Sequence, residues 1–146
     1  MNQNKFEISI INENNYLIPP GIEEIVCSTL FELKINSEVS VSIIFIDEAE
    51  MEMYNHQDVL SFEINVIDPE TGKNILGDIF ICYPFVDKQS KSIGNALADE
   101  LKLMVIHGML HLLGYTHDTD EQKQKMWDVQ SKLMILNEIK LIKMPE

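Results

Sequence analysis

Alternating apolar and polar residues mark the strands that this chain is expected to form. Apolar side chains occupy every second position in residues 6–10 and 60–66, which is the period of a strand with one buried face. Residues 38–46 become apolar on both faces toward their end, so we expect that strand to lie inside the sheet. Residues 76–83 predict a fourth strand, which should pair with the third as an antiparallel hairpin.

Helical spacing of apolar residues predicts four helices. Asp47 is placed to cap the short acidic second helix, and Thr119 with Gln122 has the pattern of a capping box at the start of the last helix. The last helix is expected to bury Met126, Val129, Leu133 and Leu136, with Trp127 covering one edge. The four helical segments are residues 22–33, residues 47–54, residues 92–113 and a segment that begins at Thr119.

These elements follow one another in the order β-α-β-α-β-β-α-α. A chain of 146 residues is long enough for one domain with a buried core, and no linker or internal repeat divides it. We therefore expect an α/β (α+β) fold: a single domain over residues 1–146, in which a mixed sheet of about four strands packs with about four helices.

Three of the four histidines crowd into one segment, HGMLHLLGYTH. His107 and His111 are four residues apart, so on a helix their rings project from the same face. Gly114 can take the left-handed conformation that ends a helix, and the turn would bring His117 back toward the other two rings. Three imidazoles are typical of a catalytic zinc site, in which the metal activates a water molecule as the nucleophile.

The spacing matches the long zinc-peptidase signature except at one position. H-E-x-x-H-x-x-G-x-x-H has its ligands and its glycine in the same register, but Gly108 stands where a peptidase has its general-base glutamate. The pattern therefore predicts a metal site and argues against peptide cleavage. Zinc is the expected ion, and imidazole also suits nickel, copper and iron.

Two other interpretations of the histidines stay open at this point. The array could be a coincidence of histidines that serve only packing or the surface. It could also be a closed structural zinc site, although such sites are rich in cysteine. Cys27 and Cys82 are far from the histidines in the sequence, and only a fold that brings Cys82 close would favour a closed site.

Charge and cysteine usage limit the partners and the compartment. The formal net charge is −13, and all 11 basic residues are lysines, which argues against broad, non-specific binding to nucleic acid. Two isolated cysteines indicate a reducing compartment. The chain has no apolar run long enough to cross a membrane and no signal-peptide pattern. We expect a cytoplasmic protein without a membrane partner.

The sequence leaves the catalytic residues unknown apart from the metal-bound water. Two carboxylates, Asp78 and Asp118, are weak candidates for assisting it. Asp78 lies in an apolar strand, where an unpaired carboxylate is costly, so it either assists catalysis or bonds to nearby backbone. Asp118 follows a predicted ligand and either orients that ligand or caps the last helix. The cap is the favoured interpretation.

Three segments resemble a known family. HGMLHLLGYTH resembles the H-G-x-L-H-L-x-G-Y-D-H motif of the YbeY family, bacterial endoribonucleases that act as ribosomal RNA maturation factors. DVLSF, residues 58–62, resembles the family's T-D-V-L-S-F, and LGDI, residues 76–79, matches its strand motif. The segments occur in the family's order and approximate spacing, so the resemblance spans most of the chain.

The resemblance implies a single-domain α/β hydrolase that binds zinc through His107, His111 and His117. It also implies metal-dependent, single-strand-specific cleavage of RNA in ribosomal RNA maturation, notably at the 3′ end of the small-subunit RNA, and a role in ribosome quality control. The implied partners are single-stranded ribosomal RNA and the ribosomal small subunit, and no DNA partner is expected.

The chain departs from the family pattern in two places. The family usually carries an arginine shortly before T-D-V-L-S-F, whereas this chain has none, and Gln57 replaces the threonine. Arginine would hold a phosphate through two N–H groups, which lysine does not match. Thr116 stands where the histidine motif has aspartate. Two alternatives therefore remain: a weakly active or inactive metal-stabilised factor that binds the ribosome, and a zinc hydrolase of another bond.

Overall fold

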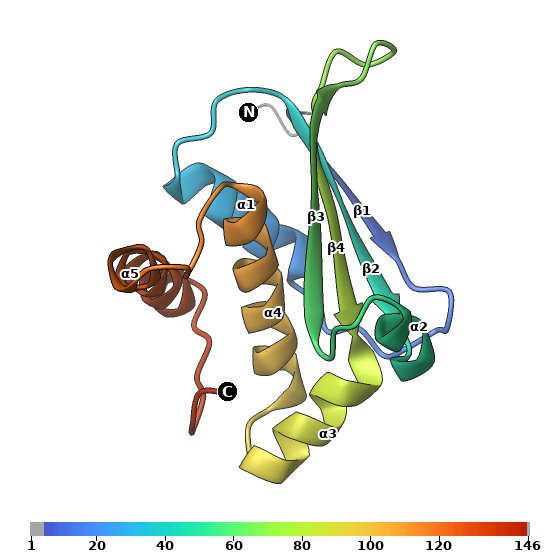
Figure 1. Ribbon diagram of the computed structural model, residues 1–146, viewed down its shortest axis with the longest axis vertical. Coiled ribbons are helices and arrows are strands. Elements are labelled where there is room, and N and C mark those ends of the chain that lie inside the picture. The colour runs from blue at the N-terminus through green and yellow to red at the C-terminus, as the bar shows by residue number, and fades with distance from the viewer. Residues whose placement is uncertain (1–4, 146) are drawn as a thin grey trace.

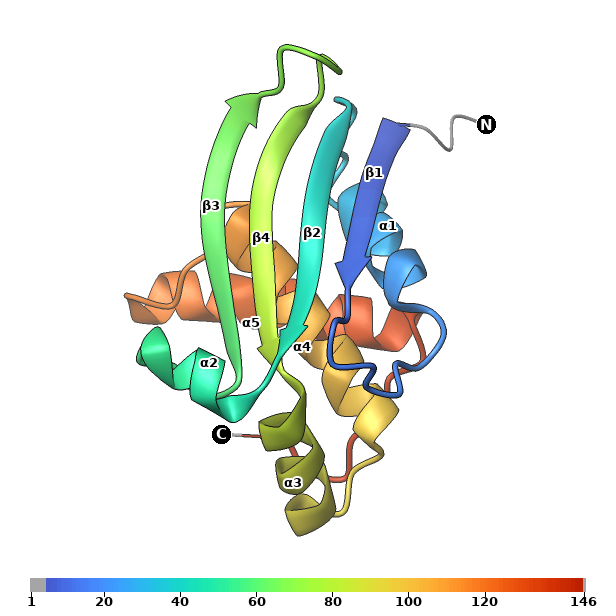
Figure 2. The same cartoon turned by 90° about the vertical axis from the view of Figure 1, so that its right-hand side faces the viewer.

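The computed structural model describes residues 5–145. They form one four-stranded sheet, with helices packed on one of its faces (Figure 1). The other face is largely uncovered, and two short helices lie at one end of the sheet (Figure 2). The elements are β1 (Phe6–Ile11), α1 (Ile22–Glu32), β2 (Val39–Ile46), α2 (Glu48–Met53), β3 (Val59–Ile67), β4 (Asn74–Cys82), α3 (Tyr83–Ile93), α4 (Leu97–Leu112) and α5 (Asp120–Leu136).

The sheet is mixed, with the strand order β1-β2-β4-β3. β1, β2 and β4 run parallel to one another, and β3 pairs antiparallel with β4. The predicted fold class is confirmed, as are the interior position of β2 and the pairing of the third and fourth strands. On the covered face, the buried residues of β2 and β4 pack with α1 and α4 to form the main core.

The sequence prediction was wrong about the segment that follows β4. Helix α3 begins directly after the strand, and α4 starts at Leu97 rather than near residue 92. Gly94, with φ 95°, ends α3 because glycine adopts the left-handed conformation at little cost. Pro84 sits in the first turn of α3, where its missing N–H is not needed. The described chain therefore has five helices, one more than predicted.

The predicted helix caps are confirmed, and one predicted core position is wrong. The Asp47 carboxylate accepts a hydrogen bond from the Glu50 N–H at 2.8 Å, and Thr119 forms the capping box of α5. Leu136 is 54% exposed because it lies at the last residue of α5, beyond the part that packs on the core. No helix within residues 5–145 is both long and apolar enough to cross a membrane.

Helix α4 approaches the sheet closely at Gly108. A Cβ atom at this position would lie 2.7 Å from Cγ2 of Ile79, a fully buried residue of β4 that has no room to move. The Ser61 hydroxyl of β3 donates a hydrogen bond to the Gly108 carbonyl at 3.0 Å. Position 108 therefore faces the sheet, and a glutamate at this position would clash with β4.

A second glycine, Gly77, allows β3 and β4 to approach at an irregularity in their pairing. Its φ is +152°, and a Cβ atom would lie 2.1 Å from the Phe62 carbonyl oxygen. We expect Gly77→Ala to lower the free energy of unfolding by at least about 2 kcal/mol, because backbone must move to accommodate the methyl group.

Gly72→Ala is the matched control for this change. Gly72 also has a positive φ, +75°, but nothing lies within 4 Å of an added Cβ, so only backbone strain of about 1 kcal/mol is expected. Urea unfolding of the two variants measures the difference, and equal losses of stability would contradict the proposed contact.

Candidate metal centre

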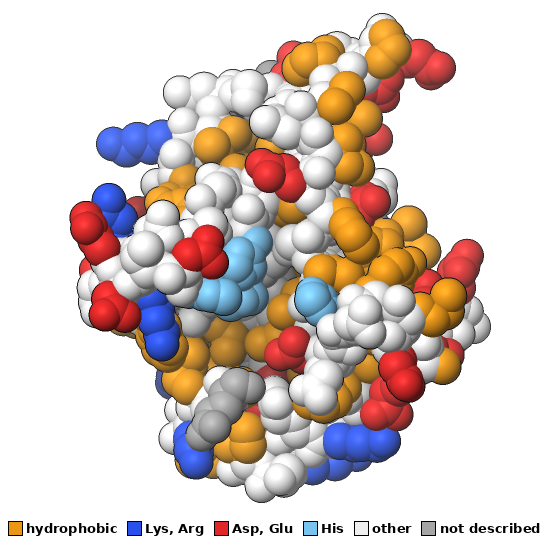
Figure 3. All heavy atoms as spheres, in the orientation of Figure 1, with side chains coloured by type: hydrophobic (Ala, Val, Ile, Leu, Met, Phe, Trp, Pro, Cys, Tyr) orange, Lys and Arg blue, Asp and Glu red, His pale blue; other side chains and the backbone are white. Residues whose placement is uncertain are grey.

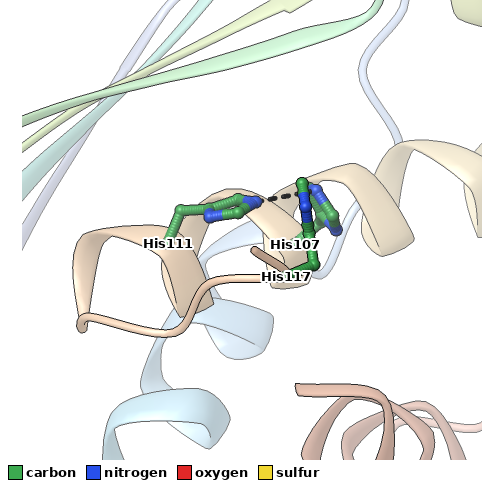
Figure 4. A group of neighbouring side chains, drawn as sticks. All are labelled: His107, His111 and His117. Carbon is green, nitrogen blue, oxygen red and sulfur yellow. Dashed lines mark hydrogen bonds between the residues drawn. The ribbon is translucent and has the colours of Figure 1, made fainter. Parts of the chain in front are cut away.

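The three clustered histidines converge in space, as the sequence predicts. One possible ligand atom from each of His107, His111 and His117 lies within 4.8 Å of the other two. Figure 4 shows the first two rings on α4 and the third on the loop that follows, all turned toward a common point. In residues 5–145 no fourth histidine, cysteine or carboxylate joins this group.

The turn at the end of α4 brings the third histidine into place. Gly114 adopts φ +97°, which confirms the predicted left-handed turn. The Gly114 N–H donates to the His111 carbonyl at 3.1 Å, and the Tyr115 N–H donates to the Leu110 carbonyl at 2.9 Å. These two bonds form a Schellman motif, which reverses the chain and returns His117 toward the helix.

Thr116 ties the same loop to the next helix. Its hydroxyl donates to Oε1 of Gln122 at 2.9 Å, and Gln122 belongs to the capping box of α5. The residue that departs from the family motif therefore contributes a polar contact between the loop that carries His117 and α5.

Two hydrogen bonds fix which ring nitrogens carry protons. Nδ1 of His111 lies 3.1 Å from the Tyr115 carbonyl oxygen, and Nδ1 of His107 lies 3.3 Å from Oε1 of Gln130. Because both partners are oxygen acceptors, both Nδ1 atoms donate. In the neutral rings, Nε2 then carries a lone pair, as a metal ligand requires.

These lone pairs face each other, and this is the observation that indicates a cation. Nε2 of His107 and Nε2 of His111 are 3.0 Å apart (dashed line in Figure 4). Two lone pairs at this distance repel unless a proton or a metal ion lies between them. Ligands on a tetrahedral zinc ion are separated by about 3.3 Å, so the residues fit such an ion after small side-chain adjustments.

Burial favours the neutral, metal-binding form of two of the rings. Burial lowers the pKa of His107, assisted by the charge of His117, while Gln130 and Asp58 act in the opposite direction. Burial also lowers the pKa of His111, followed by the charges of His107 and His117. A lowered pKa reduces the competition between protons and a metal ion for the nitrogen lone pairs.

The histidines lie in a hollow of about 630 Å³ between β3, α4 and α5. Figure 3 shows histidine side chains gathered in this hollow on the face of the molecule that it presents. Asp58, Ser61 and Glu63 line it from β3 and the residues just before that strand. Lys123, Met126, Trp127 and Gln130 line it from α5.

The carboxylates considered from the sequence lie elsewhere or have other roles. Asp78 does not line the hollow. Ile79 and Ile81 of the same strand are buried on the covered face of the sheet, so Asp78 points to the opposite face. As a catalytic candidate, Asp78 is therefore placed away from the three rings. Asp118 does not cap α5, because Thr119 does, so the favoured interpretation of Asp118 was wrong.

The cysteines give no support to a closed structural site. Cys82 is fully buried in a small cluster with Ile46 and Met51, and Cys27 lies on α1. Neither cysteine lines the hollow. The protein thus offers three imidazoles and no thiolate within the described residues, which is the ligand set of catalytic rather than structural zinc sites.

Sequence reasoning missed the partners that orient the rings. Gln130 is only 6% exposed and contacts His107, yet it was not singled out. Its signal is a polar residue within the apolar stripe of α5, four residues after Met126 and three before Leu133. The Tyr115 carbonyl, which orients His111, leaves no such signal because any residue type has a carbonyl, and the Ser61 hydroxyl, which bonds to the Gly108 carbonyl, leaves none because its role depends on contact between distant elements.

Comparisons with known proteins agree with this geometry. A family model described as Endoribonuclease YbeY matches residues 3–139. The Endoribonuclease YbeY of Bifidobacterium longum subsp. infantis is 31% identical over 141 residues, covering 88% of this chain and 78% of that protein. The Endoribonuclease YbeY of Pseudarthrobacter chlorophenolicus is 36% identical over 116 residues, covering 70% of this chain and 74% of that protein.

A solved structure has a similar fold. The solution structure of TM1509 from Thermotoga maritima aligns with a TM-score of 0.57 and 25% sequence identity. The alignment covers 90% of this chain and 88% of that one, so the similarity extends over the whole fold rather than over the histidine segment alone.

His107→Ala is expected to abolish stoichiometric metal binding, because it removes one of three ligands and leaves Gln130 without its ring partner. Metal analysis of purified, zinc-loaded protein measures the change. The control is His56→Ala, whose exposed side chain is not part of the three-histidine group. Full metal occupancy in His107→Ala would defeat the ligand assignment.

The metal-free protein is expected to lose stability as the pH falls below 6.5, the ordinary pKa of histidine. Because the folded-state pKa values of His107 and His111 lie lower, the unfolded chain takes up protons first. The contribution is fully present above 6.5 and is lost as the pH falls through the folded-state values.

Urea unfolding between about pH 7.5 and about pH 5.5, in the presence of a chelator, tests this expectation. The double variant His107→Asn/His111→Asn separates these rings from other titrating groups and should show a shallower dependence on pH. The same dependence in both proteins would show that the two rings do not contribute.

Proposed function

The chain belongs to the YbeY family of endoribonucleases, and we propose that it is a zinc-dependent enzyme that cleaves single-stranded RNA during ribosomal RNA maturation. The proposed metal ligands are His107, His111 and His117. The observation that carries the proposal is the pair of facing Nε2 lone pairs, 3.0 Å apart, beside a third imidazole in an open hollow.

Zinc suits this ligand set, because neutral imidazoles bind it well and three of them are typical of its catalytic sites. When bound, the ion supplies Lewis acidity and allows water to ionise near neutral pH. Gln130 and the Tyr115 carbonyl orient two of the rings through their Nδ1 protons. Ser61 and Gly108 hold α4 against the sheet, so the rings keep their positions relative to the hollow.

The proposed biological role follows from the family. We propose that the substrate is ribosomal RNA, with processing at the 3′ end of the small-subunit RNA and participation in ribosome quality control in the cytoplasm. The hollow has a volume of about 630 Å³, and the histidines lie within it. These features support the proposal.

A second candidate function rests on the charges that line the hollow. The chain has no arginine, whereas the family usually carries one shortly before the segment that corresponds to residues 58–62. The carboxylates of Asp58 and Glu63 line the hollow instead. This acidic wall favours a metal-stabilised factor that binds the ribosome and cleaves little RNA. Cleavage of a peptide bond is disfavoured, because Gly108 faces the sheet and offers no base.

The enzyme and the binding factor are distinguished by cleavage of a labelled single-stranded RNA. Zinc-loaded wild-type protein should cleave it, whereas His111→Ala should be slower by roughly a hundredfold or more, because the metal contributes several kcal/mol to such reactions. Circular dichroism of His111→Ala shows whether the fold is retained.

Equal cleavage by both preparations would indicate a contaminating nuclease and contradict the assignment. No cleavage by protein that holds stoichiometric zinc and still associates with ribosomal small subunits would support the binding factor instead.

A further inference from the structure

One face of α5 extends from the three histidines along the hollow. Gln130, Trp127 and Lys123 all line it and are spaced three and four residues apart, so their side chains project from the same side of the helix. Gln130 contacts the ring of His107. With a rise of about 1.5 Å per residue, Trp127 lies roughly 4.5 Å and Lys123 roughly 10 Å farther along the helix axis.

Trp127 presents an aromatic surface that the fold does not use. It is the only tryptophan of the chain and is 42% exposed, although its neighbours Met126 and Gln130 are buried. The rest of its surface is covered by the protein, so the ring is partly held in place while its exposed part lines the hollow. An indole face beside a polar hollow is a suitable platform for a nucleic-acid base, because every base can stack on an aromatic ring.

Among residues 5–145, Lys123 is the only lysine that lines the hollow. It forms no ion pair with any residue in the range 5–145, so its ammonium group is not neutralised by the protein. The opposite wall carries the carboxylates of Asp58 and Glu63. A polyanionic strand is therefore repelled by the β3 wall and attracted to the α5 wall.

We propose that Trp127 and Lys123 form a nucleotide subsite beside the metal centre. Trp127 stacks on a base next to the bond that is cleaved, and Lys123 contacts a backbone phosphate of the same strand. The subsite rests on the proposed cleavage of RNA and adds the α5 wall as the surface that positions the substrate. It provides a phosphate contact in a chain that has no arginine.

The subsite also gives a physical reason for preferring single strands. A base in a duplex is already paired and stacked, so it cannot lie flat against the indole ring without being extruded. Stacking on Trp127 is available to unpaired bases of any sequence, whereas Lys123 contacts only the backbone.

The single tryptophan makes the stacking directly observable. A short 2′-O-methyl oligoadenylate is titrated into the zinc-loaded protein while tryptophan fluorescence is recorded, and gel electrophoresis afterwards checks that the oligomer is intact. We expect saturable quenching, and much weaker quenching by an oligomer of the same length that lacks bases. Absence of quenching on saturation, or equal quenching by the abasic oligomer, would overturn the role of Trp127.

Variants of the two residues separate stacking from charge. Trp127→Ala should weaken binding of the oligoadenylate by about tenfold or more, and Trp127→Phe should restore most of it. Lys123→Gln should reduce the slope of log affinity against log salt concentration by about 0.7, the value expected for one phosphate contact on a single strand.

Lys125→Gln is the matched control for the charge. Lys125 is exposed on the same helix but does not line the hollow, so its variant should keep the wild-type slope. Equal slopes for Lys123→Gln and wild type, or equal reductions in both lysine variants, would overturn the role of Lys123.

Cleavage assays distinguish failure of the subsite from failure of the enzyme proposal. Compared with the wild-type protein, Trp127→Ala should cleave single-stranded RNA with a raised KM and a largely unchanged kcat. If the wild-type protein shows the quenching, and the Trp127→Ala and Lys123→Gln variants show the expected changes in binding, but no protein cleaves RNA, the subsite is retained and the ribonuclease proposal is rejected. Cleavage with an unchanged KM in both the Trp127→Ala and Lys123→Gln variants would retain the ribonuclease and reject the subsite.

Discussion

Two nitrogen lone pairs that face each other at 3.0 Å are the constraint around which the site is arranged. Their orientation is imposed from outside the rings: the Tyr115 carbonyl and the Gln130 side chain each accept a hydrogen bond from an Nδ1–H group and so turn Nε2 inward. Such an arrangement is unfavourable for two neutral rings alone. It becomes favourable when a cation shares both lone pairs, which is why the geometry indicates a metal more strongly than the spacing of the histidines does.

The fold holds this arrangement through a few contacts between distant parts of the chain. Gly108 allows α4 to lie directly on β4, and Ser61 attaches β3 to the same turn of the helix. The histidines project from α4 into the hollow, one wall of which comes from β3 and the other from α5. The two walls differ in charge, with Asp58 and Glu63 on one and Lys123 on the other. For the proposed RNA substrate, this difference favours contact with the α5 wall over the β3 wall.

The sequence predicted the parts of the structure that depend on local patterns. Strands, capping residues and the turn at Gly114 follow from periodicity and from residues with special backbone preferences, and the three ligands follow from their spacing. Helix α3 was missed because its apolar residues are few and Pro84 was interpreted only as the end of a strand. Gln130 and Ser61 could not be assigned, because their functions arise when α5 and β3 meet α4. Asp78 attracted attention as a charge in an apolar strand, but the side of the sheet on which it lies depends on the packing of the whole domain.

X-ray absorption spectroscopy of the zinc-loaded protein at the zinc edge tests the central claim most directly, because it reports the atoms bound to the ion without relying on activity. The account predicts nitrogen or oxygen neighbours at about 2.0–2.1 Å, with outer-shell scattering from three imidazole rings. Scattering from a sulfur atom at about 2.3 Å, or from fewer than three imidazoles, would contradict it.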